Sequence, residues 1–422
     1  MSAPTDVSPV SDITPEVVLS GPRRGSRRSW GGAGHRAGFW ITALTFLVAM
    51  AFTTVPTPLW AIYQQEDGFS TLMVTVAFAA YAVGVVVSLF LAGHLSDRFG
   101  RRRVLLPAVL IEVAAAVMFL TSTSLGVLVA ARAVTGLGIG MVTATATAYL
   151  TDLHLAARPR ADRTRADLVA TAANMGGFAV GSLVSGLLAE YAPAPLRTPY
   201  LVFLALLVIT AVATAFVPET VRPVTPRPPY RPQRVSVPDE HRPAFFAAAF
   251  AAFTTFAVLG LFTSLAPGFV AGTLHHPSRA LAGLVTFLVF AAAATTQTVL
   301  RHLALRPQLA TGLVLMPAGL VTLSTAVWLP SLPLFLAGGV LAGAGAGVLF
   351  KATVTRVLTL AAPSHRGEAL AGLFLIAYIG LAAPILSLGL ATHYVQDRTA
   401  LLGFAAILIA ICAAVSRRLL RR

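Results

Sequence analysis

Residues 93–103 read Gly93-His94-Leu95-Ser96-Asp97-Arg98-Phe99-Gly100-Arg101-Arg102-Arg103 and join two apolar stretches, 71–93 and 104–122. Each stretch approaches the roughly 20 residues that a helix needs to cross the hydrocarbon core of a bilayer. Asp97 near a helix end needs a cationic partner, and Gly93 and Gly100 permit close packing and a tight turn. A positively charged membrane anchor would explain the arginines but neither the aspartate nor the glycines. We therefore expect a gate at this turn.

Apolar stretches of similar length recur along the chain. The first set lies near 38–62, 71–93, 104–122, 126–150, 168–190 and 199–217, and the second near 244–271, 280–300, 308–328, 332–355, 368–393 and 399–416. We expect an all-α membrane protein with twelve transmembrane helices in two six-helix bundles, 38–217 and 244–416, joined by a Pro- and Arg-rich cytoplasmic linker, 218–243. Residues 1–37 are predicted to be a disordered tail and residues 417–422 a basic tail.

The composition supports this placement in lipid. Of the 422 residues, 56% are hydrophobic and 11% charged, with a mean hydropathy of +0.79, whereas soluble domains carry about 25% charged residues. The net charge of +15 is dispersed between apolar stretches, so we expect no nucleic-acid partner. Cys412 is the only cysteine, which excludes an intrachain disulfide and a thiolate zinc site.

The sequence favours neither an enzyme nor a bound cofactor or metal. Lys351 is the only lysine and precedes Ala352, so the chain contains no phosphate-binding loop of the form GxxxxGK[ST]. An enzyme embedded in the membrane would need clustered intramembrane acids or histidines, and the sequence shows no such cluster. His275 and His276 lack carboxylates at ligand spacing.

Basic residues are distributed unevenly between the predicted loops. If the N-terminus is cytoplasmic, 26 of the 31 Lys and Arg residues fall in cytoplasmic segments, three in outer loops and two inside spans. Cytoplasmic loops retain Lys and Arg. We therefore expect a multi-pass protein of the cell (inner) membrane with both termini in the cytoplasm.

The two predicted bundles share a pattern of small residues. Gly136, Gly138 and Gly140 correspond to Gly343, Gly345 and Gly347 at a constant offset of 207 residues. Gly177, Gly181 and Gly186 correspond to Gly380, Pro384 and Gly389 at an offset of 203. The similar offsets favour an internal duplication, and small residues at this spacing let helix backbones approach closely.

The 93–103 segment resembles the loop between helices 2 and 3 of the major facilitator superfamily, G-x-L-[AS]-D-R-x-G-R-[RK]-[RK], and fills every fixed position. The resemblance implies a secondary transporter whose two bundles rock about a central cavity, built largely from helices 1, 4, 7 and 10. It also implies that Asp97 and Arg101, beside Arg98 and Arg102, join an acidic residue at the end of helix 4 in a network that latches one conformation. Asp152 stands at that place, although a solvated helix end would also explain it.

Arg132 opens a second segment, Arg132-Ala133-Val134-Thr135-Gly136-Leu137-Gly138, that looks like the family's R-x-x-[QT]-G-x-G motif. An arginine inside a span costs at least about 2.5 kcal/mol on insertion scales. We expect it to face a partner or cavity inside the bundle, where the resemblance links it to proton coupling or substrate charge, with Gly136 nearby. The alternative is that its side chain extends to the outer membrane surface.

Two further ionisable residues lie inside predicted spans. Glu112 is the only carboxylate well inside any span, and burial favours the protonated form, as a proton carrier requires. It is either that carrier or a structural partner of the loop arginines, and helix 1 has no acidic residue. Lys351 either reaches the cytoplasmic surface or points inward, where with Arg132 it would favour anionic substrates.

A glycine-rich segment, 174–186, begins at Asn174 and is similar to the antiporter motif of drug exporters. Ser182 and Ser185 replace the proline and a glycine of its G-P-x-x-G-G core, so ordinary helix packing remains an alternative. Residues 217–220 resemble the family's P-E-T segment. Phe246, Phe250 and Phe253 form a stripe that either lines an apolar cavity or faces lipid.

The favoured hypothesis is a monomeric, proton-coupled secondary transporter that exports small amphipathic molecules by alternating access. Its partners would be the small-molecule substrate, protons and the lipid bilayer. Import of a sugar or organic anion is the alternative, and a non-transporting receptor or scaffold is a distant one.

Overall fold

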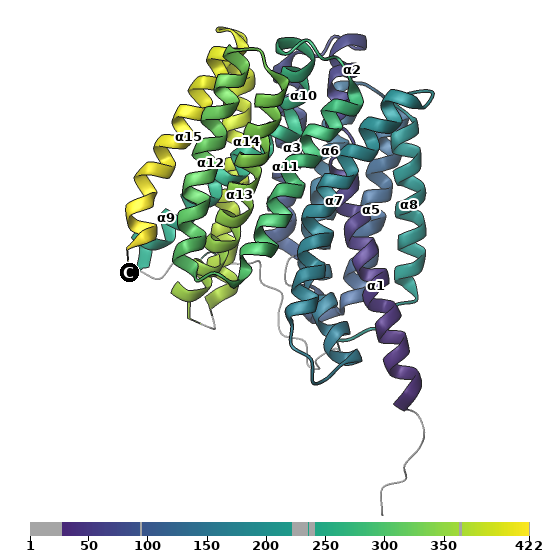
Figure 1. Cartoon of the computed structure of the whole chain (residues 1–422). Helices are drawn as coiled ribbons and strands as arrows, with labels where there is room; N and C mark the ends of the chain where they lie inside the picture. Colours follow the sequence, from purple (N-terminus) through teal and green to yellow (C-terminus); the bar gives the residue numbers. More distant parts are fainter. Residues whose placement is uncertain (1–27, 93–94, 222–234, 236–240, 363–364, 422) are drawn as a thin grey trace, which may run out of the picture.

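The computed structural model describes residues 28–92, 95–221, 235, 241–362 and 365–421. This part of the chain is helical, and twelve of its helices are long and apolar enough to cross a membrane. Figure 1 shows the purple-to-teal helices of the first half beside the green-to-yellow helices of the second. The all-α fold with two pseudo-symmetric six-helix bundles is therefore confirmed.

The first bundle contains six long helices: α1 (Arg28–Thr53), α3 (Thr71–Ala92), α5 (Arg101–Thr121), α6 (Leu125–Ala157), α7 (Thr164–Tyr191) and α8 (Thr198–Ala215). Short helices η1 (Thr57–Leu59), α2 (Trp60–Glu66) and α4 (Leu95–Phe99) lie between them. Helix α1 begins at Arg28, within the segment predicted as a tail. A helix adds one hydrogen bond for each residue that joins it, so a stable span can extend beyond its apolar part.

The second bundle contains α9 (Arg242–Ser264), α11 (Arg279–Val299), α12 (Leu305–Trp328), α13 (Leu332–Leu360), α14 (Arg366–Ala391) and α15 (Asp397–Leu420). Short helices α10 (Ala266–Gly268), η3 (Phe269–Thr273) and η4 (Leu300–His302) complete it. Helix α15 continues past the predicted boundary at 416. Most of the linker between the bundles lies outside the described residues.

The predicted glycine repeat corresponds to a repeated packing arrangement. Gly136 and Gly140 of α6 pack against α3, whereas Gly138, on another face of α6, packs against α5. In the second bundle, Gly343 and Gly347 of α13 pack against α11, and Gly345 packs against α12. A Cβ atom at any of these positions would overlap the neighbouring helix, so glycine permits the close approach.

The first helix of each bundle is interrupted by proline. Helix α1 ends at Thr53 ahead of Pro56 and Pro58, and α9 ends at Ser264 ahead of Pro267. Proline lacks a backbone N–H and clashes with the preceding turn, so it ends or bends a helix. The carbonyl groups at these breaks are consequently available to side chains of other helices.

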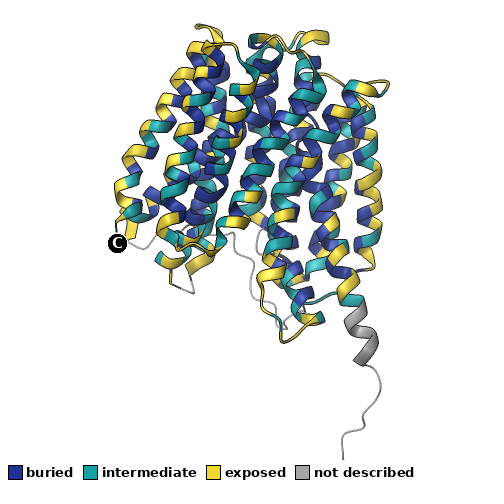
Figure 2. Cartoon of the chain, in the orientation of Figure 1, coloured by how far each residue is buried: buried dark blue, intermediate teal, exposed yellow. Residues whose placement is uncertain are grey.

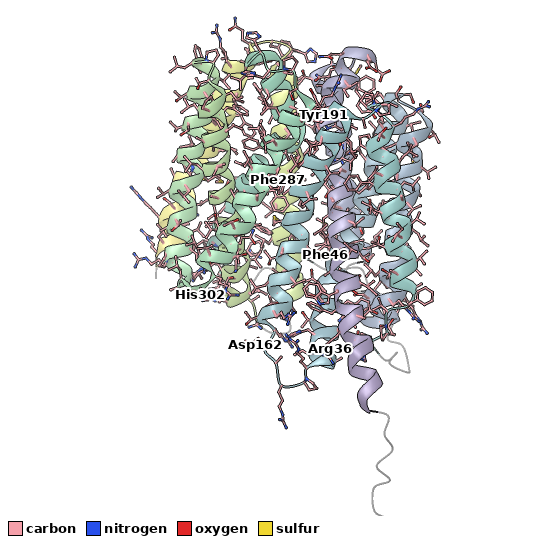
Figure 3. The ribbon with its side chains drawn as sticks, turned by 45° about the vertical axis from the view of Figure 1, so that its right-hand side comes forward. Arg36, Phe46, Asp162, Tyr191, Phe287 and His302 are labelled. Atoms are coloured by element: carbon pink, nitrogen blue, oxygen red, sulfur yellow. The ribbon has the colours of Figure 1, made fainter. Side chains whose placement is uncertain are left out.

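The two ends of the molecule differ in how the bundles meet. We call the end with the 95–103 turn the Asp97 end, and the opposite end the Glu190 end. Figure 3 places Arg36, Asp162 and His302 at the first and Tyr191 at the second. Buried residues concentrate between the helices, while the outward faces carry exposed apolar residues such as Ile209 and Val314 (Figure 2). An apolar outer face matches a lipid surrounding.

Candidate functional site

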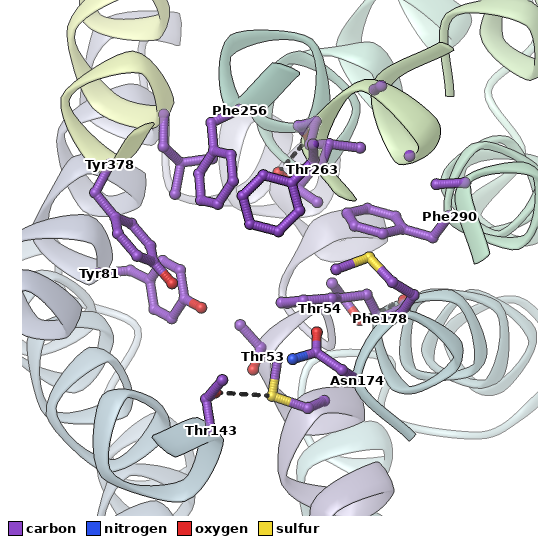
Figure 4. Close-up of a pocket in the computed structure, with 18 of the residues that line it drawn as sticks. Thr53, Thr54, Tyr81, Thr143, Asn174, Phe178, Phe256, Thr263, Phe290 and Tyr378 are labelled. Carbon is purple, nitrogen blue, oxygen red and sulfur yellow. Dashed lines mark hydrogen bonds between the residues drawn. The ribbon is translucent and has the colours of Figure 1, made fainter. Parts of the chain in front are cut away.

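A cavity lies between the two bundles. Its volume is about 910 Å³ with the part open to solvent included, and residues of α1, α3, α6 and α7 face residues of α9, α11, α13 and α14 across it. The first, fourth, seventh and tenth spans, predicted from the resemblance, therefore contribute together with four others. Figure 4 shows Tyr81, Tyr378 and Phe256 facing the same space as Thr53 and Asn174.

Arg132 lies on the cavity wall with 3% of its surface exposed. Its Nη1 donates a hydrogen bond of 2.8 Å to the carbonyl oxygen of Thr53, at the last residue of α1. The carbonyl end of a helix is electronegative, so the guanidinium caps the interrupted helix. Its Cζ lies 4.6 Å from the ring centroid of Tyr81 and 5.6 Å from that of Phe78. Arg132 is thus held inside the bundle.

Glu112 is fully buried on α5 and lies outside the cavity wall. Its carboxyl group packs on Gly138 of α6, and neither carboxyl oxygen has a hydrogen-bond partner among the described residues. Glu112 lies nine residues before the end of α5, and Arg132 lies seven residues after the start of α6. At 1.5 Å per residue these are roughly 13 Å and 10 Å from the same end. The two side chains thus lie at similar depths on neighbouring helices, and no hydrogen bond joins them among the described residues.

The other predicted cavity residues have different positions. Asn174 lies on the wall. Gly136 does not, because its Cα faces the backbone of α3 at Tyr81 and Gly84. Lys351 lies outside the wall as well, since its Nζ donates a 3.0 Å hydrogen bond to the carbonyl oxygen of Gln297 in the last turn of α11.

The charged turn at the Asp97 end is organised around Arg101. Its Nη1 forms an ion pair with Asp97 and a 2.9 Å hydrogen bond to Ser96 Oγ. Its Nε lies 2.9 Å from Asp152 Oδ2 on α6. The predicted set Asp97, Arg101 and Asp152 is therefore brought together within one bundle. Gly100 has φ +107°, a conformation that favours glycine.

Glu219 completes this network and was not predicted as a site residue. Its carboxylate accepts hydrogen bonds from the backbone N–H groups of Arg101 (2.8 Å) and Arg102 (3.1 Å) at the start of α5. A carboxylate at a helix N-terminus is stabilised by the unpaired N–H groups there. Arg102 Nη1 donates to the carbonyl oxygens of Ala215 and Val217. The P-E-T resemblance pointed to Glu219 without indicating this role.

Two further residues were predicted for the gate. Arg98 lies in α4 with its side chain partly exposed. Gly93 lies outside the described residues.

Hydrogen bonds join the two bundles at the Glu190 end. Glu190 Oε2 at the end of α7 accepts from the backbone N–H of Arg279 (2.7 Å), the first residue of α11. Ser182 Oγ donates to the carbonyl oxygen of Gly283 (3.3 Å), and Thr57 Oγ1 donates to that of Thr263 (2.9 Å). These contacts hold the two bundles together on the Glu190 side. Sequence reasoning missed Glu190, since a lone glutamate near a span end carries no pattern.

The 174–186 segment takes part in this closure. Gly177 and Gly181 pack against α1 at Met50 and Ala51, and Gly186 packs against Gly283 of α11. The segment therefore connects the interrupted helix α1 with the second bundle.

Within the described residues, no three His, Cys, Asp or Glu side chains are placed to hold a metal ion.

The chain matches the sequence profile of a known protein family. The sequence profile of the Major Facilitator Superfamily matches residues 41–316. An arabinose-proton symporter of Bacillus subtilis is 36% identical over 83 residues, which cover 20% of this chain and 18% of the relative. An uncharacterized MFS-type transporter of Mycobacterium tuberculosis is 33% identical over 188 residues, 44% of this chain and 26% of the relative. The chain thus spans about a quarter or less of these relatives in the aligned regions.

Two solved structures share the fold. The human organic anion transporter MFSD10 superimposes with a TM-score of 0.67 at 18% identity, and a point mutant of the nucleoside transporter NupG with 0.65 at 14% identity. Each comparison covers 90% of this chain and 99% of the other.

Proposed function

This chain belongs to the major facilitator superfamily of membrane transporters, and on that premise we propose that it is a proton-coupled secondary transporter of small amphipathic molecules. The observation that carries the proposal is the placement of Arg132. It is held by the interrupted end of α1 on the wall of a cavity between two bundles. A buried arginine on an aromatic cavity wall is suited to ligand binding and not to membrane anchoring.

Alternating access follows from the difference between the two ends. Hydrogen bonds cross between the bundles at the Glu190 end, whereas the Arg101 network at the Asp97 end lies within the first bundle. Breaking the first set of contacts and closing the bundles at the Asp97 end would expose the cavity to the other side. From the distribution of basic residues, we assign the Asp97 end to the cytoplasm.

Proton coupling is assigned to Glu112 and Arg132. Glu112 is buried without a hydrogen-bond partner among the described residues, and an isolated carboxylate in such surroundings costs several kcal/mol unless it is protonated or paired. In this proposal the positive charge of Arg132, on the neighbouring helix α6, offsets the charge of ionised Glu112. Binding of a charged substrate beside Arg132, on the cavity wall, would therefore change the protonation of Glu112, which lies outside that wall. The relative from Bacillus subtilis, named a proton symporter, supports protons as the coupling ion.

The direction of transport depends on whether substrate binding favours or opposes protonation of Glu112. The export predicted from the 174–186 segment requires antiport, in which substrate and proton exclude one another. A cationic substrate would repel the proton from Glu112 and satisfy that condition.

A second candidate, import of an organic anion with protons, is favoured by Arg132. It is the only Lys, Arg, His, Asp or Glu residue on the cavity wall formed by the described residues. An anion bound there would neutralise the charge that stabilises ionised Glu112, so anion and proton would bind together and cross in the same direction.

Flux into proteoliposomes with an imposed pH gradient tests the function. We expect the parent to accumulate or expel substrate in response to the gradient, and both Arg132→Ala and Glu112→Gln to lose that response. The direction of accumulation separates symport from antiport. If neither substitution alters gradient-driven flux, the assignment of coupling to these residues is wrong.

A further inference from the structure

The charge on the cavity wall comes from one side chain. Of the 22 wall residues that the structure describes, Arg132 is the only one with a Lys, Arg, His, Asp or Glu side chain. Glu112 is separated from the cavity and forms no hydrogen bond with Arg132 among the described residues. A ligand in the cavity therefore meets a positive charge and no carboxylate in direct contact.

The guanidinium of Arg132 has unused bonding capacity. It has five N–H donors, of which one donates to the carbonyl oxygen of Thr53, and its Nε is buried without a partner in the described part of the chain. The faces of Tyr81 and Phe78 compensate the charge only in part, since a cation–π contact contributes about 0.5–2 kcal/mol. Hydrogen bonds between a guanidinium and a carboxylate are shorter and about twice as strong as neutral ones. An anionic group would complete this site.

The facing wall, from the second bundle, is aromatic. Phe256 of α9 lies 5.2 Å from Phe350 of α13 and 5.2 Å from Tyr378 of α14, measured between ring centroids. Phe374 lies 6.0 Å from Phe350. Rings at these separations form a surface on which a flat apolar group can stack or pack edge to face. Figure 4 shows Phe256 and Tyr378 across the space from Thr53.

The remaining polar groups offer few donors for a polyhydroxylated ligand. The hydroxyl groups of Thr53, Thr54 and Thr263 donate to backbone carbonyl oxygens of Ala49, Phe178 and Leu259. Besides Arg132, Asn174 and Gln297 supply the side-chain N–H groups of the wall. The hydroxyl groups of Tyr81 and Tyr378 add two further polar groups to the wall. A sugar has more hydroxyl groups than these can pair with, and those left against the aromatic rings would be costly.

From these observations, and resting on the proposed transport function, we infer that the cavity binds an organic anion that carries an aromatic or similarly flat apolar group. The anionic group binds Arg132 of the first bundle. The ring packs on Phe256, Phe350 and Tyr378 of the second bundle. Such a ligand bridges the two bundles and fits the second candidate function, import of an organic anion with protons. An amine would meet the positive charge of Arg132 with no carboxylate on the described wall, and only aromatic faces could offset its charge.

The test uses three probes with one ring system and different charges. They are naphthalene-1-carboxylate, naphthalene-1-carboxamide and naphthalen-1-ylmethylammonium, with binding to the purified full-length protein measured by calorimetry. We expect the carboxylate to bind at least roughly tenfold more tightly than the other two, which corresponds to one charge-assisted interaction of about 1.4 kcal/mol. Equal affinity of all three, tighter binding of the amine, or binding of none would overturn the inference.

Variants at Arg132 separate charge from shape. Arg132→Gln should weaken binding of the carboxylate roughly 10- to 100-fold and change that of the carboxamide less than about twofold. Retained carboxamide binding also shows that the variant is folded. Arg132→Lys should recover part of the lost affinity. Arg306→Gln, at an exposed position of α12, is the matched control. Unchanged carboxylate binding to Arg132→Gln would contradict the assignment.

Measurements of binding and of transport distinguish an error in the ligand class from an error in the proposed function. If the carboxylate binds selectively but does not cross proteoliposome membranes, the ligand class stands and the function falls. If the protein moves neutral or cationic compounds and not the carboxylate, transport stands and the ligand class is wrong.

Discussion

Glu112 of the first bundle and Met316 of the second occupy corresponding places. Glu112 packs on Gly138 of α6, and Met316 packs on Gly345 of α13, the glycine at an offset of 207. Both side chains are fully buried. Gly345 meets the backbone and Cβ of Met316, whereas Gly138 meets the carboxyl end of Glu112. The second bundle therefore packs this pair of helices around an apolar residue, without a buried carboxyl group. We therefore interpret Glu112 as a functional residue whose burial reduces stability.

Arg132, like Glu112, has an uncharged residue at the corresponding position of the second bundle. At an offset of 207 the second bundle has Gly339, so it lacks both intramembrane charges of this pair. The second bundle instead supplies the ring cluster of Phe256, Phe350 and Tyr378. On the cavity wall, the first half of the repeat thus supplies the charged side chain and the second half the ring cluster.

Replacing Glu112 with the residue found at the corresponding place should have the largest effect. We expect Glu112→Met to reduce flux driven by a pH gradient to the level of liposomes without protein, because the titrating group is gone. Exchange of labelled for unlabelled substrate at equal pH should persist, since the cavity is intact. The midpoint of thermal denaturation should not fall. If Glu112→Met keeps gradient-driven flux at the parental rate, Glu112 is not the residue that couples transport to protons.

The reciprocal substitution should reduce stability. Met316→Glu places a carboxyl group in the second bundle without a nearby arginine, and we expect a loss of about 2–4 kcal/mol in the free energy of unfolding in detergent. Met316→Leu is the matched control, with an expected loss below about 1.5 kcal/mol. If the two variants are equally stable, a buried carboxyl group does not lower the free energy of unfolding here. The burial of Glu112 would then need no functional explanation.

Alanine substitutions at the paired glycines should differ in a predictable way. A Cβ atom at Gly345 would overlap the backbone of Met316, whereas at Gly138 it would meet the end of the Glu112 side chain, which can rotate. Gly345→Ala should therefore lose about 1–3 kcal/mol of unfolding free energy and Gly138→Ala less. Denaturation of both variants in the same detergent measures the difference. A larger loss at Gly138 would contradict the packing described here.

The smallest effect is expected at the charged turn. Asp97 pairs with Arg101 in the first bundle, whereas the corresponding turn of the second bundle, 300–306, has no acidic residue. Asp97 is 64% exposed, and an exposed ion pair contributes about 0.2–1 kcal/mol. Asp97→Asn should slow substrate exchange by up to about fivefold while binding affinity stays unchanged. Abolished binding in a folded protein would indicate a direct substrate role instead.

The sequence predicted the fold and part of the site. Length and hydropathy identified the spans. The family resemblance of the 93–103 segment predicted that Asp97 and Arg101 meet an acidic residue at the end of helix 4, where Asp152 stands. The cost of burying an arginine predicted that Arg132 faces the bundle interior, and in the structure it lies on the cavity wall with 3% of its surface exposed. Each of these features depends on local sequence or on one strong energetic constraint.

The rest depends on neighbours that are distant in sequence. Phe246 and Phe250 are 44% and 43% exposed on the outer surface, while Phe256 of the same helix lines the cavity. Their spacing does not show which face of α9 meets the other bundle. Glu190 and Glu219 likewise acquire partners from α11 and α5, and the packing of helices determines those contacts.

Glu112 should take up a proton when an anion binds at Arg132. Proton uptake can be followed with a pH-sensitive dye in weakly buffered solution while naphthalene-1-carboxylate binds to the purified protein across a series of pH values. We predict that the parent takes up as much as about one proton per bound ligand at the pH where Glu112 titrates. Glu112→Met should take up none at any pH. Equal uptake by both proteins, or none by the parent, would show that Glu112 does not couple proton binding to ligand binding.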